Sequence, residues 1–249
     1  MRELGSKIAL VTGGAKNIGR AICLALGRGG AEILVNTRQS VEIAQETVKL
    51  VEAAGGEAMV VQADITDPGD VARMVATGVD AYAGIDILVN NAGIRKEAPL
   101  TEVSFAEWRE ILSGMLDGSF LCTQACAKVM RKRGGGSIVM IGGMTGHSGA
   151  KQRAHVVTAR AGLAGFTKAA AMDLAEFGIT ANCVVPGLID TQRGVHNPSN
   201  PHHHAGRAMP LGRRGTADEV AALVRFLCGP EARYITGQSL HINGGALMI

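Results

Sequence analysis

Short apolar runs alternate with longer amphipathic segments along most of this chain. The runs predict β-strands at residues 8–11, 32–36, 58–62, 85–89, 137–141, 180–185 and 239–242. The segments between them carry apolar residues at helical spacing and predict helices at residues 18–26, 41–54, 67–82, 104–131, 154–177 and from 216 onward. Strands that alternate with helices of this length predict an α/β fold, with a parallel sheet covered by helices on both faces.

Local signals mark the start of several predicted helices. Asp67 is an N-cap residue followed by a proline, which is well placed at the first helical position because its missing N–H has no partner there. Ser104 and Glu107 have the spacing of a capping box, and Thr216 and Glu219 repeat it at the last helix.

The whole chain, residues 1–249, is predicted to be one domain. It contains no internal repeat, linker or low-complexity tract, and its length suffices for one sizeable core. The formal net charge of +3 is too small to indicate nucleic acid or a membrane surface as a partner, and no apolar run reaches the ~18 residues of a spanning helix. A strand pattern rather than a signal-peptide core follows the first residues, so we expect a soluble cytoplasmic protein.

The cysteines and one histidine cluster are the residues to weigh as metal ligands. Cys122 and Cys126 lie one helical turn apart in an apolar stretch without a histidine or third cysteine nearby, so buried free thiols are expected. His202, His203 and His204 are consecutive, and such residues rarely converge on one ion without further ligands. No bound metal is expected.

Residues 11–20, V-T-G-G-A-K-N-I-G-R, join the first predicted strand to the first predicted helix. Gly13 and Gly14 permit a tight turn and the close approach of a ligand to the backbone. The free N–H groups at the start of the following helix favour an anion such as a phosphate. A glycine-rich turn can also simply join two elements, so this motif alone does not decide the function.

Further motifs follow this turn in order. The set is Thr12-Gly13-x-x-x-Asn17-x-Gly19, Asp64, Asn90-Asn91-Ala92-Gly93, Pro186-Gly187-x-x-x-Thr191, and Gly237 with Gly244-Gly245. Together the motifs resemble the short-chain dehydrogenase/reductase family over essentially the whole chain, in the layout of its 3-oxoacyl-carrier-protein reductases. The resemblance implies a Rossmann-type doubly wound parallel sheet of about seven strands, a bound nicotinamide dinucleotide and a homotetramer.

The resemblance also assigns roles at the cofactor site. Asp64 would meet the adenine, residues 91–93 would lie along the cofactor, and Thr191 would face the nicotinamide end. Asn17 stands where the family usually has a glycine, and asparagine tolerates left-handed geometry best among the other residues. The predicted cofactor residues are Gly13, Lys16, Asn17, Ile18, Gly19, Arg38, Asp64, Asn91, Ala92, Gly93, Arg160, Pro186, Gly187 and Thr191.

The end of the second strand indicates which dinucleotide to expect. NAD-specific relatives carry a carboxylate there for the ribose hydroxyls, whereas Asn36-Thr37-Arg38 supplies none. Arg38 and Lys16 are cations suited to a 2′-phosphate, so NADP(H) is favoured over NAD(H). The alternative is that both are solvated surface charges.

The catalytic part of the family pattern is substituted. The family uses an asparagine, a serine that holds the carbonyl oxygen, a tyrosine that transfers the proton and a lysine. The corresponding positions here are Met115, Gly143, Val156 and Arg160. The first three side chains offer no proton, and an arginine stays protonated at any ordinary pH. Arg160 can still hold the cofactor ribose.

Neighbouring residues are candidates for the missing proton donor. His155 and His147 can act as acid or base near neutral pH, and a structural role is the alternative for His155. Successive helical residues point about 100° apart, so His155 does not simply replace Val156. Thr145 and Thr158 can orient a carbonyl group but are poor acids.

Residues 190–214 interrupt the alternation of strands and helices with a polar segment that resembles the family's variable substrate lid. Its histidines or Arg207 are candidates to contact an acidic or polar substrate, and a solvated loop is the alternative.

Two functions follow from these observations. The first is an NADP-dependent oxidoreductase that acts on a small carbonyl or alcohol with a non-standard proton donor. The second is a catalytically inactive dinucleotide-binding homologue, either regulatory or a structural subunit in a hetero-oligomer with an active relative. A non-redox enzyme is less favoured, because halohydrin dehalogenases carry arginine at the lysine position but keep the serine and tyrosine.

Overall fold

The computed structural model describes residues 2–191 and 209–249. Its strands are β1 (Ile8–Val11), β2 (Glu32–Thr37), β3 (Glu57–Gln62), β4 (Ile87–Asn90), β5 (Gly136–Ile141), β6 (Ile179–Pro186) and β7 (Ser239–Ile242). In the described part of the chain these strands form one sheet in the order β3-β2-β1-β4-β5-β6-β7, with every pair parallel. The predicted Rossmann-type sheet is confirmed.

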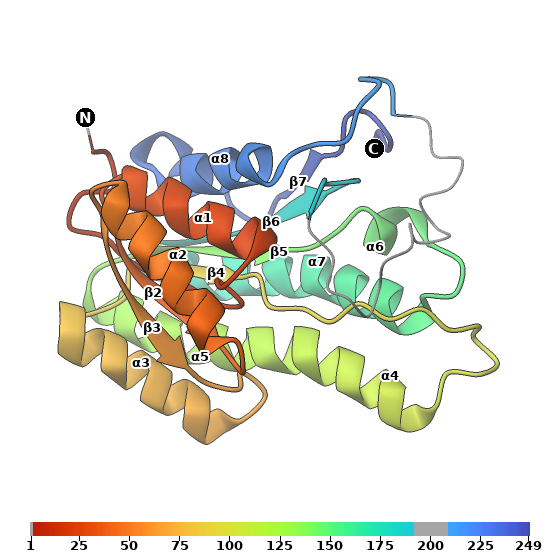
Figure 1. Cartoon of the computed structure of the whole chain (residues 1–249), viewed down its shortest axis with the longest axis horizontal. Coiled ribbons are helices and arrows are strands. Elements are labelled where there is room, and N and C mark those ends of the chain that lie inside the picture. Colours follow the sequence, from red (N-terminus) through yellow and green to blue (C-terminus); the bar gives the residue numbers. More distant parts are fainter. Residues whose placement is uncertain (1, 192–208) are drawn as a thin grey trace.

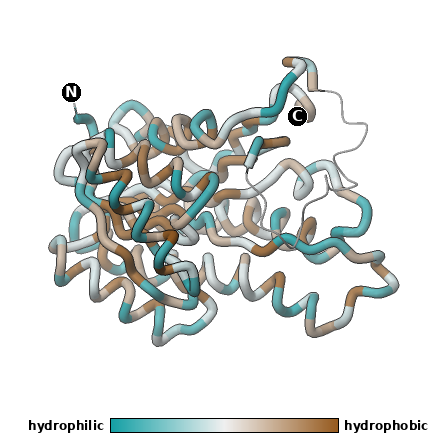
Figure 2. Tube along the Cα trace, in the orientation of Figure 1, coloured by the Kyte–Doolittle hydropathy of each residue, from teal (hydrophilic) through white to brown (hydrophobic). Residues whose placement is uncertain are grey.

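Helices cover both faces of the sheet, as predicted (Figure 1). One face carries α1 (Asn17–Arg28), α2 (Val41–Ala53) and α8 (Ala217–Cys228). The other carries α3 (Pro68–Tyr82), α4 (Phe105–Leu112), α5 (Gly118–Lys132) and α7 (Ala154–Leu174), and the short α6 (Thr145–Ser148) follows β5. Figure 2 shows hydrophobic residues concentrated on the strands and on the inward sides of the helices. Two buried apolar layers, one on each side of the sheet, therefore hold the fold together.

The predicted helix at 104–131 has a break that the sequence pattern did not predict. A π-helical turn, Ser113–Asp117, separates α4 from α5, and Met115 within it is buried. Such turns shift the following side chains around the helix axis and are frequent at functional sites. The predicted helix at 154–177 likewise ends in a 3₁₀ turn, Ala175–Phe177.

Strand β4 begins two residues later than the strand predicted at residues 85–89. The cause is Asp86, whose carboxylate accepts a hydrogen bond from the Ile8 backbone N–H at 3.0 Å and pairs with Arg133. The Asp86 backbone N–H donates to the Ile8 carbonyl oxygen at 2.9 Å, and the paired register with β1 runs from Ile87 onward, although Ile85 is fully buried.

Several other expectations can be compared directly with the structure. Ser104 caps α4 by accepting from the Glu107 backbone N–H at 3.1 Å, and Thr216 and Glu219 form a full capping box on α8. The five cysteines are buried and free, and burial raises the pKa of Cys122 to about 12. In the described residues no helix combines the length and the apolar character needed to cross a bilayer.

Candidate active site

A cavity of about 610 Å³ opens at the carboxyl ends of the central strands, where the chain order reverses between β1 and β4. Open parallel sheets bind ligands in the crevice at this point. The lining includes these predicted cofactor residues: Gly13, Lys16, Asn17, Ile18, Gly19, Arg38, Asp64, Asn91, Ala92, Gly93, Arg160, Pro186 and Gly187.

The turn after β1 has the geometry of an anion cradle. Gly13 has φ +61° and Asn17 has φ +52°, so the asparagine adopts the left-handed backbone predicted for it. A Cβ atom at residue 19 would lie 2.7 Å from Nδ2 of Asn91, so only glycine fits there. No side chain of the described residues caps the N-terminus of α1, and its first turn contains no acid. These open N–H groups fit the pyrophosphate of a dinucleotide.

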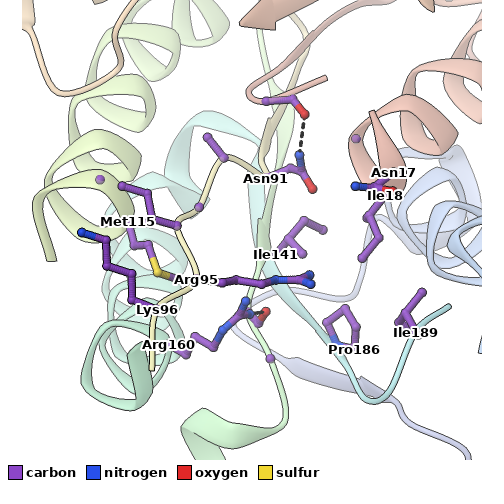
Figure 3. A pocket seen from close by; sticks show the side chains of 18 of the residues that line it. Asn17, Ile18, Asn91, Arg95, Lys96, Met115, Ile141, Arg160, Pro186 and Ile189 are labelled. Atoms are coloured by element: carbon purple, nitrogen blue, oxygen red, sulfur yellow. Dashed lines mark hydrogen bonds between the residues drawn. The ribbon is translucent and has the colours of Figure 1, made fainter. Parts of the chain in front are cut away.

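Asn91 ties this turn to the loop that follows β4. Its side-chain amide donates to the carbonyl oxygens of Thr12 at 2.9 Å and Gly13 at 3.0 Å (Figure 3). Thr12 Oγ1 in turn accepts the backbone N–H groups of Asn91 and Ala92, each at 3.0 Å. The cavity wall is therefore held in place by hydrogen bonds within the protein.

The end of β2 contributes a buried amide behind the glycine-rich turn and a cation at the cavity rim. Asn36 Oδ1 accepts the Gly13 N–H at 3.3 Å, so this amide supports the glycine-rich turn. Arg38 is exposed, with Nη1 3.5 Å from Oδ2 of Asp64. Burial raises the pKa of Asp64, but hydrogen bonds from Thr66 and the charge of Arg38 outweigh it, and the net shift is downward. Lys16 is exposed at the same rim.

At the other end of the cavity, Arg160 reaches from α7 to the turn after β5. Its Nη1 donates to the carbonyl oxygen of Gly142. A Cβ atom at Gly143 would lie 2.8 Å from the Arg160 Cζ, so the guanidinium fills the space that a side chain at residue 143 would need. Burial, with the charges of Arg95 and Arg153, lowers the pKa of Arg160 to about 9, so this group is still a cation at neutral pH.

Arg95 and Arg153 also line this end, although neither was predicted from the sequence as a site residue. Arg95 follows β4 on an exposed loop, whereas Arg153 is the N-cap residue of α7 and is buried. Figure 3 shows the side chains of Arg95 and Arg160 entering the region between Met115 and Pro186. Arg95 lies two residues after the Asn-Asn-Ala-Gly motif, so its place in the sequence could have indicated that it lines the cavity.

Comparisons with known proteins agree with this geometry. The family model described as Enoyl-(Acyl carrier protein) reductase matches residues 13–246. The 3-oxoacyl-[acyl-carrier-protein] reductase of Synechocystis sp. is 39% identical over 249 residues, with all of both chains covered. The chain belongs to the short-chain dehydrogenase/reductase family. The corresponding reductase of Staphylococcus aureus is 35% identical, covering 98% of this chain and 99% of the relative.

A solved structure of the family has the same architecture. A Sinorhizobium meliloti protein of the short-chain alcohol dehydrogenase type superimposes with a TM-score of 0.90 at 32% identity, covering 98% of this chain and 97% of that one. The sequence resemblance predicts that Met115, Gly143, Val156 and Arg160 stand at the family's catalytic positions. Met115, Gly143 and Arg160 line the cavity, whereas Val156 is fully buried and is not among the described lining residues.

The candidate proton donors of this short-chain dehydrogenase/reductase lie in different environments. His155 is fully buried; its Nε2 lies 2.9 Å from Oε1 of Glu107 and its Nδ1 accepts the Val156 N–H at 3.0 Å. Neither His155 nor His147 is among the described lining residues, and Thr158 is likewise outside the cavity. Thr145 lines the cavity.

His147 packs edge-on against a second histidine. Its ring centroid lies 4.7 Å from that of His241, and burial, with the charge of Lys168, lowers the pKa of His147. The structure therefore brings the dinucleotide motifs together but does not bring either candidate histidine to the cavity wall.

Part of the predicted substrate segment lies outside the described residues. Residues 192–208 belong to it, including His202, His203, His204 and Arg207. Thr191 is described but is not among the lining residues. Within the described ranges, no group of three or more metal-ligating side chains is gathered in one place.

Proposed function

We propose that this protein is an NADP-dependent oxidoreductase that interconverts a small carbonyl compound and its alcohol, with a non-standard proton donor. The observation that carries the proposal is the continuous cavity, which joins a preformed phosphate cradle at Gly13 and Gly19 to a fixed cation, Arg160. Its size suits a cofactor and a small substrate together. The relatives named as 3-oxoacyl-[acyl-carrier-protein] reductases support the reaction class.

Different described residues would bind the cofactor and the substrate in this reaction. The open N–H groups of α1 and the backbone beside Asn91 would hold the dinucleotide, whose nicotinamide transfers a hydride when it is bound. Arg160 occupies the space next to Gly143, so its N–H groups would hold the carbonyl oxygen and stabilise the negative charge that develops there. Thr145 offers a hydroxyl on the same wall.

The proton for the substrate oxygen would come from water in the cavity. Among the described lining residues there is no tyrosine, histidine or cysteine. His155, the earlier candidate, is enclosed and engages Glu107 and the backbone of Val156. A positioned general acid typically contributes ~10²–10⁴ in rate, so this arrangement predicts slow turnover.

Turnover is tested by mixing the protein with NADPH and a panel of small carbonyl compounds while following absorbance of the reduced cofactor. We expect NADPH oxidation that depends on the enzyme and is lost in Arg160→Met, because that variant removes the group that holds the oxygen. Binding of NADPH without oxidation of any substrate would refute the proposal. Loss of turnover in a folded His155→Ala variant would instead assign the proton donor to His155.

Cofactor preference is a separate prediction. Arg38 and Lys16 lie at the cavity rim beside Asp64 and fit a 2′-phosphate. Arg38→Ala should weaken NADPH binding about tenfold or more and leave NADH binding nearly unchanged, as measured by cofactor fluorescence titration. Arg28→Ala, on α1 but outside the cavity lining, is the matched control. Equal affinities of the parent protein for the two cofactors would contradict NADP preference.

The substituted catalytic positions favour a second candidate, a dinucleotide-binding homologue without redox turnover. Met115 and Gly143 place no ionisable group on the cavity wall, and Val156 lies in the core. In this case the chain would act as a regulatory or structural subunit in a hetero-oligomer with an active relative. The same turnover experiment separates the two candidates. A homotetramer in the cytoplasm is our proposal for the active enzyme and rests on the family resemblance.

A further inference from the structure

Three guanidinium groups come together at the end of the cavity away from the glycine-rich turn. Arg153 is the N-cap residue at the start of α7, and Arg160 lies in the second turn of the same helix. Arg95 approaches from the loop after β4, and all three line the cavity. We call Arg95, Arg153 and Arg160 the guanidinium cradle.

The charges in the cradle act on one another. After burial itself, the charges of Arg95 and Arg153 are the strongest influences that lower the pKa of Arg160. Among the described residues that line this end of the cavity, Glu97 carries the one carboxylate, and its side chain is exposed. Lys96 is paired with Glu110 at 2.5 Å and points away from the centre of the cavity (Figure 3). Gathering like charges on a partly buried wall is unfavourable, and a ligand of opposite charge offsets that cost.

The geometry points to a substrate class: we propose that the guanidinium cradle binds the carboxylate of a small oxo acid or of the corresponding hydroxy acid. A guanidinium is a planar fork of N–H donors that matches a carboxylate. Within the described part of the chain, Arg160 uses one of its five N–H groups on the Gly142 carbonyl. Its guanidinium can therefore hold the reacting carbonyl oxygen while Arg95 and Arg153 bind the adjoining carboxylate. This assignment as a substrate site rests on the proposed oxidoreductase function.

The cofactor phosphates are the other source of negative charge in this cavity. They have donors of their own in the turn that contains Gly13 and Gly19 and at the start of α1, on the opposite side from the cradle. The two anion sites should therefore be occupied at the same time. A carboxylate ligand is expected to bind with NADPH and not in competition with it.

The test uses oxalate, a small unreactive dicarboxylate, and oxamide, its neutral planar analogue. Binding is measured by isothermal titration calorimetry at fixed ionic strength, with the full-length protein alone and saturated with NADPH. We expect oxalate to bind in both states and oxamide to bind at least tenfold more weakly. Arg153→Gln and Arg160→Gln should each weaken oxalate binding about tenfold or more, because each removes charge-assisted hydrogen bonds.

Two further variants keep this test decisive. Arg95→Gln changes an exposed loop residue, so it preserves the fold even where a buried substitution does not, and it should also weaken oxalate binding. Arg109→Gln removes a surface arginine of α4 outside the cavity lining and should change nothing. Equal oxalate affinity in Arg95→Gln and Arg109→Gln would overturn the proposal. So would oxamide or sulfate binding as tightly as oxalate, or displacement of oxalate by NADPH.

The outcomes also separate this inference from the proposed function. If NADPH binds and is oxidised with neutral ketones while oxalate does not bind, only the carboxylate assignment fails. If oxalate binds through the cradle but no oxo acid is reduced, the redox proposal fails and the cradle remains as a carboxylate site.

Discussion

At the scale of single residues, Gly143 and Arg160 act as one unit. The Arg160 guanidinium lies where a side chain on residue 143 would be, and it donates to the neighbouring Gly142 carbonyl. The long, charged side chain of Arg160 therefore fits into this part of the cavity wall because residue 143 is a glycine. A side chain introduced at residue 143 requires the Arg160 guanidinium to move.

This coupling leads to a prediction for the Gly143→Ser variant. Its Cβ atom would lie 2.8 Å from the Arg160 Cζ, so the guanidinium has to move in a packed wall. We expect the free energy of unfolding to fall by about 1–3 kcal/mol, measured by urea denaturation. Gly149→Ser, at a site with no atom within 4 Å of an added Cβ, controls for loss of glycine itself, although its φ of +71° adds some backbone strain.

A double-mutant cycle supplies the sharper measurement. Combining Gly143→Ser with Arg160→Lys replaces the wide guanidinium by a narrower ammonium and makes room for the hydroxymethyl group. The two changes should be non-additive by about 0.5–3 kcal/mol, as expected for residues in contact. Strict additivity would show that the guanidinium does not occupy the space beside residue 143.

At the scale of elements, α8 is the helix whose start is fixed most completely by local chemistry. Thr216 Oγ1 accepts the Glu219 backbone N–H at 3.1 Å, and the Glu219 carboxylate accepts the Thr216 N–H at 2.8 Å. The helix then packs its buried face, including Val220 and Val224, into the apolar layer that also contains α1. Since α1 begins in the glycine-rich turn, this packing supports the dinucleotide end of the cavity.

Removal of the cap is a direct test of this element. Thr216→Ala should lower the free energy of unfolding by about 1 kcal/mol, which for a chain of this size is a fall in Tm of about 2–4 °C. Thr216→Ser keeps the hydroxyl and should remain close to the parent value. A Tm for Thr216→Ala that equals that of Thr216→Ser would show that the hydrogen bond contributes nothing to stability.

The elements were largely predictable because their signals are local. Apolar runs flanked by turn residues located the strands, and the capping pairs located the starts of α4 and α8. The π-helical turn at Ser113–Asp117 was not predictable, since one extra residue in a helical turn leaves the apolar pattern nearly unchanged. That turn matters for the site because it carries Met115 into the cavity wall.

At the scale of the whole molecule, the sheet order places the loops that follow β1 to β6 around one crevice. That arrangement could be predicted from the alternation of strands and helices. The side chains that line the crevice could not all be predicted from the sequence. Arg95 and Arg153 lie outside the family motifs, and nothing in the spacing of the sequence shows that their side chains meet Arg160. The contact between His155 and Glu107 was equally unpredictable, because it joins residues 48 positions apart in the sequence.

The pairing of α1 with α8 has a consequence for synthesis of the chain on the ribosome. Glu3 pairs with Arg225 across 222 residues of sequence, at 2.8 Å between Oε2 and Nη2, and the apolar layer around α1 includes Leu227. During translation, the part of the α1 apolar surface that packs against α8 stays exposed until α8 leaves the exit tunnel. This apolar surface is therefore available to chaperones until translation is nearly complete.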